Sequence, residues 1–323
     1  MVNSYLAQRA THSQERLAQL RKKLLEIGEL QSLPGLSIYV TGSYGRLEAS
    51  LRSDLDLFLV QHDIRDCEVI SNTTQTLINA EIIKIARELG FPEFSNDGEY
   101  LKIHSLKEML LNLGGSKDDA SNHFTARLLL LLESRPVFND GTYDLVMTEI
   151  VDAYFRDYHD HETNFRPIFL VNDILRFWKT LCLNYENKRN IPTGDLGKKN
   201  KAYLRNLKIK FSRLLTCFAT VIPLSAVPKI SPQEITVLVK TPPLSRLRNF
   251  VENDDAKQRI FMTVVDDYGW FLEQSARTDA ESWIGDRGNR GDAFARARQF
   301  GSSLYALLQE ATKSTDSLRY LVM

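Results

Sequence analysis

Hydrophobic residues in the first third of the chain predict helices packed on a sheet. Apolar residues recur at helical spacing over 5–27 and 72–89, and Gly90 gives the second helix a stop signal. Mainly apolar runs at 36–40 and 55–61 predict two strands, and the alternating segment 99–104 predicts a third. We also expect short helices near 46–50 and over 106–113.

From about residue 118 the strand signals disappear and helical patterns dominate. The dense run Ala126–Leu132 predicts a helix buried on most sides. Further helices are expected over 143–158, 167–185, 231–240 and 293–311, and the polar tail 312–317 is expected to be mobile. The pattern therefore predicts an α+β chain, with a sheet-forming domain in residues 1–116 and an α-helical domain in residues 117–323.

The stretch between the first two predicted strands carries the clearest candidate chemistry. Gly42, Ser43 and Gly45 follow the first strand, where glycines allow a tight turn that presents backbone N–H groups to a phosphate. Asp54 and Asp56 sit two residues apart in the second strand, so both carboxylates should project from one face. Two such carboxylates repel each other unless a cation lies between them, and Mg²⁺ prefers oxygen ligands. The alternative reading is a surface turn followed by an edge strand.

This motif resembles the signature of the DNA polymerase β nucleotidyltransferase superfamily: Gly42-Ser43, ten residues, then Asp54-Leu55-Asp56. The close match covers about twenty residues. The resemblance implies a mixed sheet with flanking helices, two Mg²⁺ ions with Mn²⁺ as a substitute, and release of pyrophosphate. It also implies a nucleoside triphosphate such as ATP, whose phosphates contact the Gly-Ser loop and Arg46, and a helical domain that shapes the substrate pocket.

The superfamily often places a third carboxylate on the next strand, and this sequence has no acidic residue in the middle of 99–104. Glu99, at the edge of that strand, is the nearest candidate for a metal ligand or for the base that deprotonates the attacking hydroxyl. Its alternative role is that of a surface residue. His104 could also reach the site, although a lone histidine is more often a packed side chain.

Two cations in the helix predicted over 167–185 are further nucleotide-binding candidates. In oligonucleotide-making and poly(A)-polymerase-like enzymes, a helix with a basic residue near an aromatic one commonly faces the triphosphate, and Arg176-Phe-Trp-Lys179 looks similar. Spacing i, i+3 puts Arg176 and Lys179 on one helix face. They could equally form a solvated stripe beside a buried Phe177 and Trp178.

Charge is balanced overall, with 41 basic and 41 acidic residues, which argues against nucleic-acid binding through bulk charge. One window, 186–213, is strongly basic and also carries Tyr203. With Tyr185 beside it, the window could hold a single-stranded oligonucleotide over 188–213, or it could be a solvated basic loop and helix. The glycine-rich stretch 283–292 follows no strand and lacks a Walker lysine, so it is not predicted to be a phosphate loop.

The remaining composition indicates a cytoplasmic protein. The three cysteines, Cys67, Cys182 and Cys217, are isolated, which suits a reducing compartment. We find no signal-peptide pattern and no apolar run long enough to span a membrane, so no membrane partner is expected.

These residues favour an enzyme that joins nucleotides to a hydroxyl without a template, as do bacterial second-messenger and oligonucleotide synthases of antiphage defence, with an effector protein as a candidate partner. The alternative is nucleotidylation of a protein, a tRNA or a small molecule by a toxin-type or regulatory transferase. A catalytically dead module has no need to keep two repelling carboxylates. Tyr320, in the C-terminal tail, is a candidate acceptor, or else it packs the chain end onto the helical domain.

Overall fold

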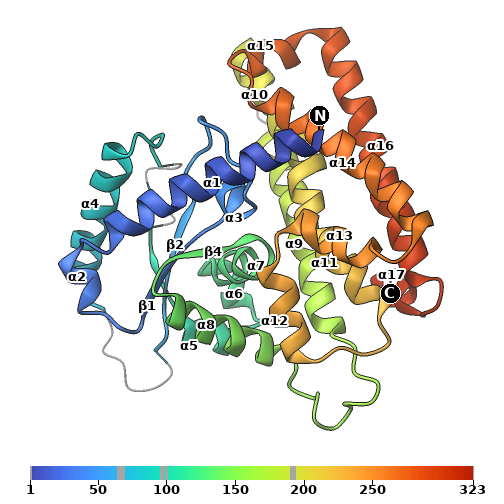
Figure 1. Ribbon diagram of the computed structural model, residues 1–323. Helices are drawn as coiled ribbons and strands as arrows, with labels where there is room; N and C mark the ends of the chain where they lie inside the picture. Colours follow the sequence, from blue (N-terminus) through green and yellow to red (C-terminus); the bar gives the residue numbers. More distant parts are fainter. Residues whose placement is uncertain (1, 64–69, 95–97, 99–100, 190–193, 323) are drawn as a thin grey trace. The chain divides into compact units, whose positions relative to one another are not determined.

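The computed structural model describes residues 2–63, 70–94, 98, 101–189 and 194–322. It confirms a mixed α+β chain, about 70% helical, with a four-stranded mixed sheet in the described residues. The chain forms two compact units (Figure 1). The sheet unit comprises Leu6–Asp157 and Pro232–Pro242, and the helical unit comprises Met1–Tyr5, Tyr158–Ser231 and Pro243–Met323. The predicted domain boundary at 116/117 therefore falls inside the sheet unit.

The sheet has the spatial order β3-β2-β1-β4. Its strands are β1 (Leu36–Val40), β2 (Leu57–Gln61), β3 (Ile103–Ser105) and β4 (Arg135–Phe138). β1 is antiparallel to β2 and β4, whereas β2 and β3 are parallel. The sequence did not predict β4, because it contains Pro136. A proline fits at this place because β4 is an edge strand, where a missing N–H need not break the sheet ladder.

Helices cover both faces of the sheet. The helices of this unit are α1 (Val2–Leu24, from Leu6 onward), α2 (Gly28–Gln31), α3 (Gly42–Gly45), α4 (Asn72–Glu88), α5 (Leu106–Leu111), α6 (Ser116–Ala120), α7 (His123–Glu133), α8 (Asp140–Ala153) and α12 (Pro232–Lys240). Leu57 and Leu59 share a hydrophobic cluster with α1, α2 and α4. On the other face, the Tyr39 ring stacks on Phe58 and its hydroxyl donates to the Ala126 carbonyl of α7. A short helix predicted near 46–50 is instead α3, four residues earlier.

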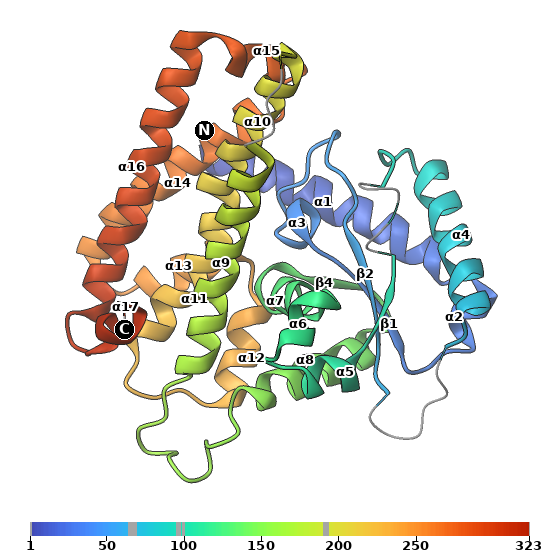
Figure 2. The ribbon, with the colours of Figure 1, turned by 180° about the vertical axis from the view of Figure 1, so that it is seen from behind.

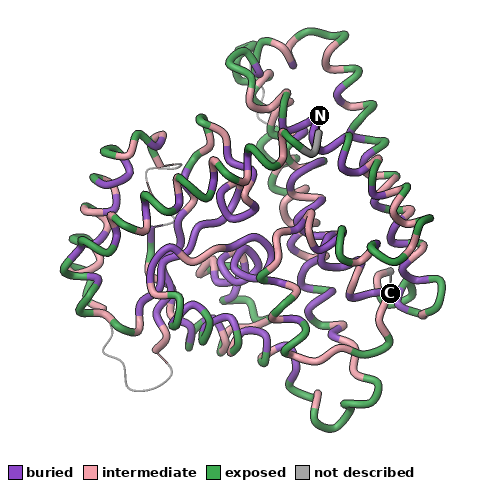
Figure 3. The backbone as a smooth tube through the Cα atoms, viewed as in Figure 1, coloured by how far each residue is buried: buried purple, intermediate pink, exposed green. Residues whose placement is uncertain are grey.

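Every residue of α7 except Thr125 is buried, which confirms the prediction of a helix buried on most sides. Figure 3 shows α7, β1 and β2 in the buried class. Its Arg127 is fully buried and donates two hydrogen bonds to Asp118, at 2.8 and 2.6 Å, and one to the Tyr154 hydroxyl at 2.9 Å. Burial alone would lower the pKa of Arg127, but its bonds to Asp118 and Tyr154 outweigh burial and raise that pKa. Arg127 is therefore a structural cation.

The helical unit is built from helices (Figure 2) that enclose an aromatic core. Its helices are α9 (Ile168–Arg189), α10 (Leu196–Lys208), the π-helical turn η2 (Ile209–Arg213), α11 (Leu214–Ala226), α13 (Pro243–Val251), α14 (Asp255–Ser275), α15 (Ala280–Gly285), α16 (Arg287–Thr312) and α17 (Ser317–Val322). In the core, Phe211 lies 4.7 Å from Phe271 and 4.9 Å from Phe300 between ring centroids. By length and composition alone, the continuous helix Leu196–Ala226 could cross a membrane, which the sequence patterns did not predict, and 61% of its apolar window is buried inside the protein.

The tail that the sequence predicted to be mobile is ordered in this unit. After α16 ends at Thr312, the Thr315 hydroxyl donates to the Ser225 carbonyl at 2.9 Å and Ser317 is buried. α17 then packs against α9, α11 and α16. The chain end is therefore attached to the helical unit.

Candidate active site

The loop after β1 is held in the shape that only glycine accommodates well. Gly42 opens α3 with φ +65°, in the left-handed region. An added Cβ on Gly42 would lie 2.6 Å from Oδ2 of Asp56, and the Thr41 N–H donates to the Asp56 carbonyl at 2.9 Å. The Gly-Ser loop and the second aspartate are therefore in direct contact.

The two aspartates lie just ahead of β2 rather than inside it. The predicted strand 55–61 begins at Leu57, and Asp54 and Asp56 occupy the segment that leads into it. Leu55 is buried at 2% exposure, whereas Asp54 is exposed and Asp56 is half-buried. This alternation fits the expectation that both carboxylates turn away from the cluster that holds Leu55.

A buried network of ion pairs holds the loop in place. Glu133, at the end of α7, accepts a hydrogen bond from the Gly42 N–H at 3.2 Å and one from Arg46 at 2.6 Å. Arg46 also donates to Glu48 at 2.7 Å, and all three charged side chains are at most 6% exposed. Gly45 completes the fit, because a Cβ there would lie 1.8 Å from the Glu133 carbonyl oxygen. The network fixes α3 against α7.

This network gives Arg46 a structural role, whereas the resemblance implies that Arg46 binds phosphate. The guanidinium is buried between two carboxylates, so its charge already stabilises Glu48 and Glu133. The Gly42 N–H is likewise directed at Glu133. Arg46 and the Gly42 N–H therefore already bond to carboxylates. The half-buried Ser43 hydroxyl remains a candidate donor to phosphate.

Glu99, the predicted third carboxylate, lies outside the described residues. Within the described part of the chain, no group of three or more His, Cys, Asp or Glu side chains could hold a metal ion. His104, the other candidate on β3, is 2% exposed and stacks on Phe58 with 5.9 Å between ring centroids. Burial and the nearby charges of His123 and Lys102 lower the pKa of His104 to about 3. His104 is therefore a neutral core residue at physiological pH.

The other predicted residues belong to the helical unit. Arg176 lies on α9 and pairs with Asp173 one turn away, at 3.5 Å, while Lys179 on the same helix is exposed. Phe177 is buried, as the alternative expects, whereas Trp178 is half-buried and packs edge-on against Phe218. Nucleotide binding by Arg176 and Lys179 stays a prediction.

Tyr320 lies on α17 and is 41% exposed, beside a small pocket shared with Leu321 and Arg166. The packing of α17 agrees with the alternative role of Tyr320, in which it packs the chain end onto the helical domain. The role of Tyr320 as an acceptor stays a prediction.

Sequence reasoning did not identify Glu133 and Glu48 as residues of the site. A signal for Glu133 was present, because it directly follows the buried run of leucines and so had to find a partner for its charge. Its partner Arg46 is 87 residues away in the chain, which no local pattern reveals.

Comparison of the sequence with protein-family models and with curated proteins finds no match. The functional assignment therefore depends on the residues of the site themselves.

Proposed function

We propose that this chain is a Mg²⁺-dependent nucleotidyltransferase that joins a nucleotide from a triphosphate to a hydroxyl acceptor without a template. The observation that carries the proposal is the contact between the two halves of the motif: Asp56 Oδ2 lies 2.6 Å from the place that a Cβ of residue 42 would occupy. A phosphate bound at Ser43 would then lie beside the carboxylates that the chemistry requires.

The residues present fit a hard divalent cation. Asp54 and Asp56 both turn away from the hydrophobic cluster, and the missing side chain at Gly42 leaves a cradle against Oδ2 of Asp56. These two carboxylates would hold Mg²⁺, whose role when bound is to activate the attacking hydroxyl and to neutralise charge on pyrophosphate. Carboxylates with phosphate oxygens and water form the ligand set that Mg²⁺ commonly takes.

The protein's own residues would bind and orient the substrate. Ser43 would donate a hydrogen bond to a phosphate oxygen, and the network of Glu133 and Arg46 would keep the loop in place. The acceptor oxygen then forms a bond to the α-phosphorus, the bond from that phosphorus to its bridging oxygen breaks, and pyrophosphate leaves. The hydroxyl proton is lost to solvent.

A product assay tests the proposal. Purified protein is incubated with Mg²⁺ and each α-labelled ribo- or deoxynucleoside triphosphate, pyrophosphate release is measured, and free oligomers are separated from labelled protein. We expect release that EDTA stops and that falls at least about a hundredfold in Asp54→Asn and Asp56→Asn, because each loses a metal ligand. The exposed Asp160→Asn, in the helical unit, is the matched control.

The label identifies the acceptor. Free oligomers or cyclic dinucleotides indicate a nucleotide acceptor, as in antiphage signal synthesis, whereas label on protein or added tRNA indicates the alternative transferase. Undiminished pyrophosphate release by a folded Asp56→Asn variant would refute the proposed site.

A further inference from the structure

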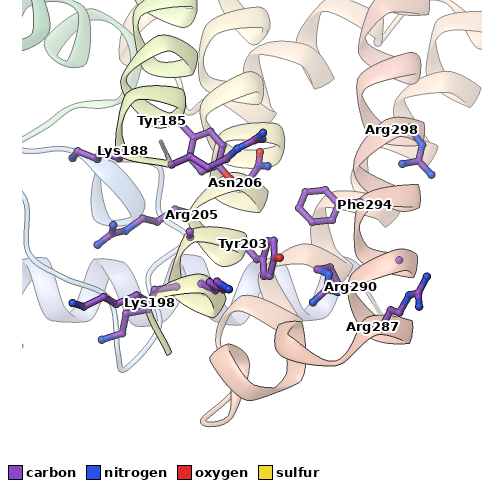
Figure 4. A pocket seen from close by; sticks show the side chains of 15 residues that line it. Tyr185, Lys188, Lys198, Tyr203, Arg205, Asn206, Arg287, Arg290, Phe294 and Arg298 are labelled. Carbon is purple, nitrogen blue, oxygen red and sulfur yellow. The ribbon is translucent and has the colours of Figure 1, made fainter. Parts of the chain in front are cut away.

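A large basic pocket lies within the helical unit, between the C-terminal end of α9, α10 and the first turns of α16 (Figure 4). Its volume is about 1340 Å³. Nine of the described residues that line it are lysine or arginine, and none of the described lining residues is acidic. In a chain whose net charge is zero, this is a strong local concentration of positive charge.

Most of these charges have no partner of opposite sign in the described structure. Of the nine lining cations, one makes an ion pair there: Arg189 with Glu186, at 3.5 Å. Arg290 donates to the Gly285 carbonyl at 3.0 Å, which leaves its charge unneutralised. Lys201, Arg205 and the other lining lysines are exposed, so the pocket presents its charge to solvent. A polyanion would relieve the mutual repulsion.

The pocket also contains aromatic rings at half-buried positions. Tyr203 comes from α10 and Phe294 from α16, and Figure 4 shows both rings beside the space between these helices. The Arg290 guanidinium lies over the Tyr203 ring, 4.6 Å from its centroid. Rings and guanidinium planes among cations are the combination that stacks bases while the phosphates are neutralised.

The α16 side of the pocket begins in the glycine-rich stretch 283–292. This stretch was not predicted to bind phosphate, because it follows no strand. In the structure this stretch spans the end of α15 and the start of α16, where Asp286 caps the helix by accepting from the Asn289 N–H at 2.9 Å. Arg287 and Arg290 then enter the pocket from α16 and meet the basic window on α10.

We infer that this pocket binds single-stranded nucleic acid. Its volume exceeds the usual range of small-ligand sites, roughly 300–1,000 Å³. Nine cations also outnumber the charges of one nucleoside triphosphate, so a chain of phosphates suits the pocket better. The rings require unpaired bases for stacking, which a duplex or a lipid surface does not offer. The inference does not depend on the transfer chemistry, and binding is tested without Mg²⁺ or triphosphate.

Fluorescence anisotropy with a labelled single strand of about 12 nucleotides, within the site sizes of known single-strand binders, measures the affinity. Each phosphate contact contributes about 0.7 to the slope of log K against log salt. Arg205→Gln or Arg287→Gln should therefore reduce that slope by about 0.7 and weaken binding about fourfold at physiological salt. Arg248→Gln and Arg259→Gln, exposed on α13 and α14 outside the pocket, are matched controls that should change neither value.

Ring variants test stacking separately from charge. Tyr203→Ala should weaken binding roughly tenfold, whereas Tyr203→Phe keeps the ring and should stay close to the wild-type affinity. Melting temperatures confirm that each variant is folded. A duplex of the same length should bind more weakly than the single strand.

Three results would overturn the inference. The first is equal loss in pocket variants and controls, which would indicate non-specific binding. The second is an unchanged affinity in Tyr203→Ala together with equal competition by inorganic polyphosphate, which would indicate a site for phosphate chains without bases. The third is displacement of the strand by ATP at concentrations near the dissociation constant of the strand, which would indicate a mononucleotide pocket.

Discussion

Replacement of Gly42 by alanine tests whether the loop and Asp56 form one site. The new Cβ would lie 2.6 Å from Asp56 Oδ2, and ordinary contact begins at 3.4 Å, so the carboxylate or the loop must shift by 3.4 − 2.6 = 0.8 Å. A misplacement of about 1 Å in a catalytic group can cost about a hundredfold in rate. We therefore expect Gly42→Ala to lower kcat/KM for pyrophosphate release about a hundredfold.

Gly90→Ala is a matched control for the backbone. Gly90 also has a positive φ, +71°, but no atom lies within 4 Å of its added Cβ. Both substitutions place alanine in the left-handed region, at a cost of about 1–2 kcal/mol, which lowers Tm by several degrees. The variants thus share the backbone penalty and differ in the contact with Asp56.

The assay compares both variants at a temperature where each is fully folded by circular dichroism. The expected result is near-normal turnover in Gly90→Ala and a large loss in Gly42→Ala. If Gly42→Ala kept the activity of Gly90→Ala, the closeness of the loop to Asp56 would have no part in the chemistry, and the proposed site would lose its main support.

Three further predictions follow from the buried and exposed polar groups. Arg46→Ala should lower the unfolding free energy by about 3–5 kcal/mol, because Glu48 and Glu133 stay buried without their cation; a normal Tm with a raised triphosphate KM would instead support phosphate binding. Below about pH 6.5 the unfolded chain protonates His104 and the folded chain, with a pKa of about 3, does not, so unfolding free energy should fall by about 2 kcal/mol between pH 6.5 and about pH 5. Urea titration should show a shallower pH dependence in His104→Phe, and an unchanged one would contradict the assignment. Tyr320→Phe removes one oxygen from an exposed side chain, so it should stop self-labelling and leave Tm unchanged if this tyrosine is the acceptor, and continued labelling would exclude it.

Local patterns predicted the sheet elements that bear the motif. β1 has the predicted bounds, and β2 begins two residues later than expected because the aspartates end its apolar run. The helix predicted over 231–240 is α12, Pro232–Lys240, with proline at its first position. These elements were predictable because their signals are periodic and close in sequence.

The parts that were missed depend on distant partners. β4 becomes a strand because it pairs with β1, about one hundred residues earlier. Its proline argues against a strand when the local sequence is considered alone. The start of α16 was missed because Gly288 and Gly291 argue for a loop, while the Asp286 cap and the packing of Ala293 and Ala297 favour helix. Burial of Arg46 could not be predicted either, since its second carboxylate comes from α7.

The path of the chain through the two units has a consequence for biosynthesis. The sheet unit is interrupted by residues 158–231 and is completed by α12, whose Ile235 and Val239 are at most 2% exposed and whose end is tied to α8 by the Lys240–Asp144 pair at 2.8 Å. A ribosome must therefore make most of the protein before this core can close. Nascent chains halted earlier would expose apolar surface of α7 and α8 and would be substrates for chaperones. A fragment ending at residue 157 should likewise be poorly soluble, although it is long enough to suggest an independent domain.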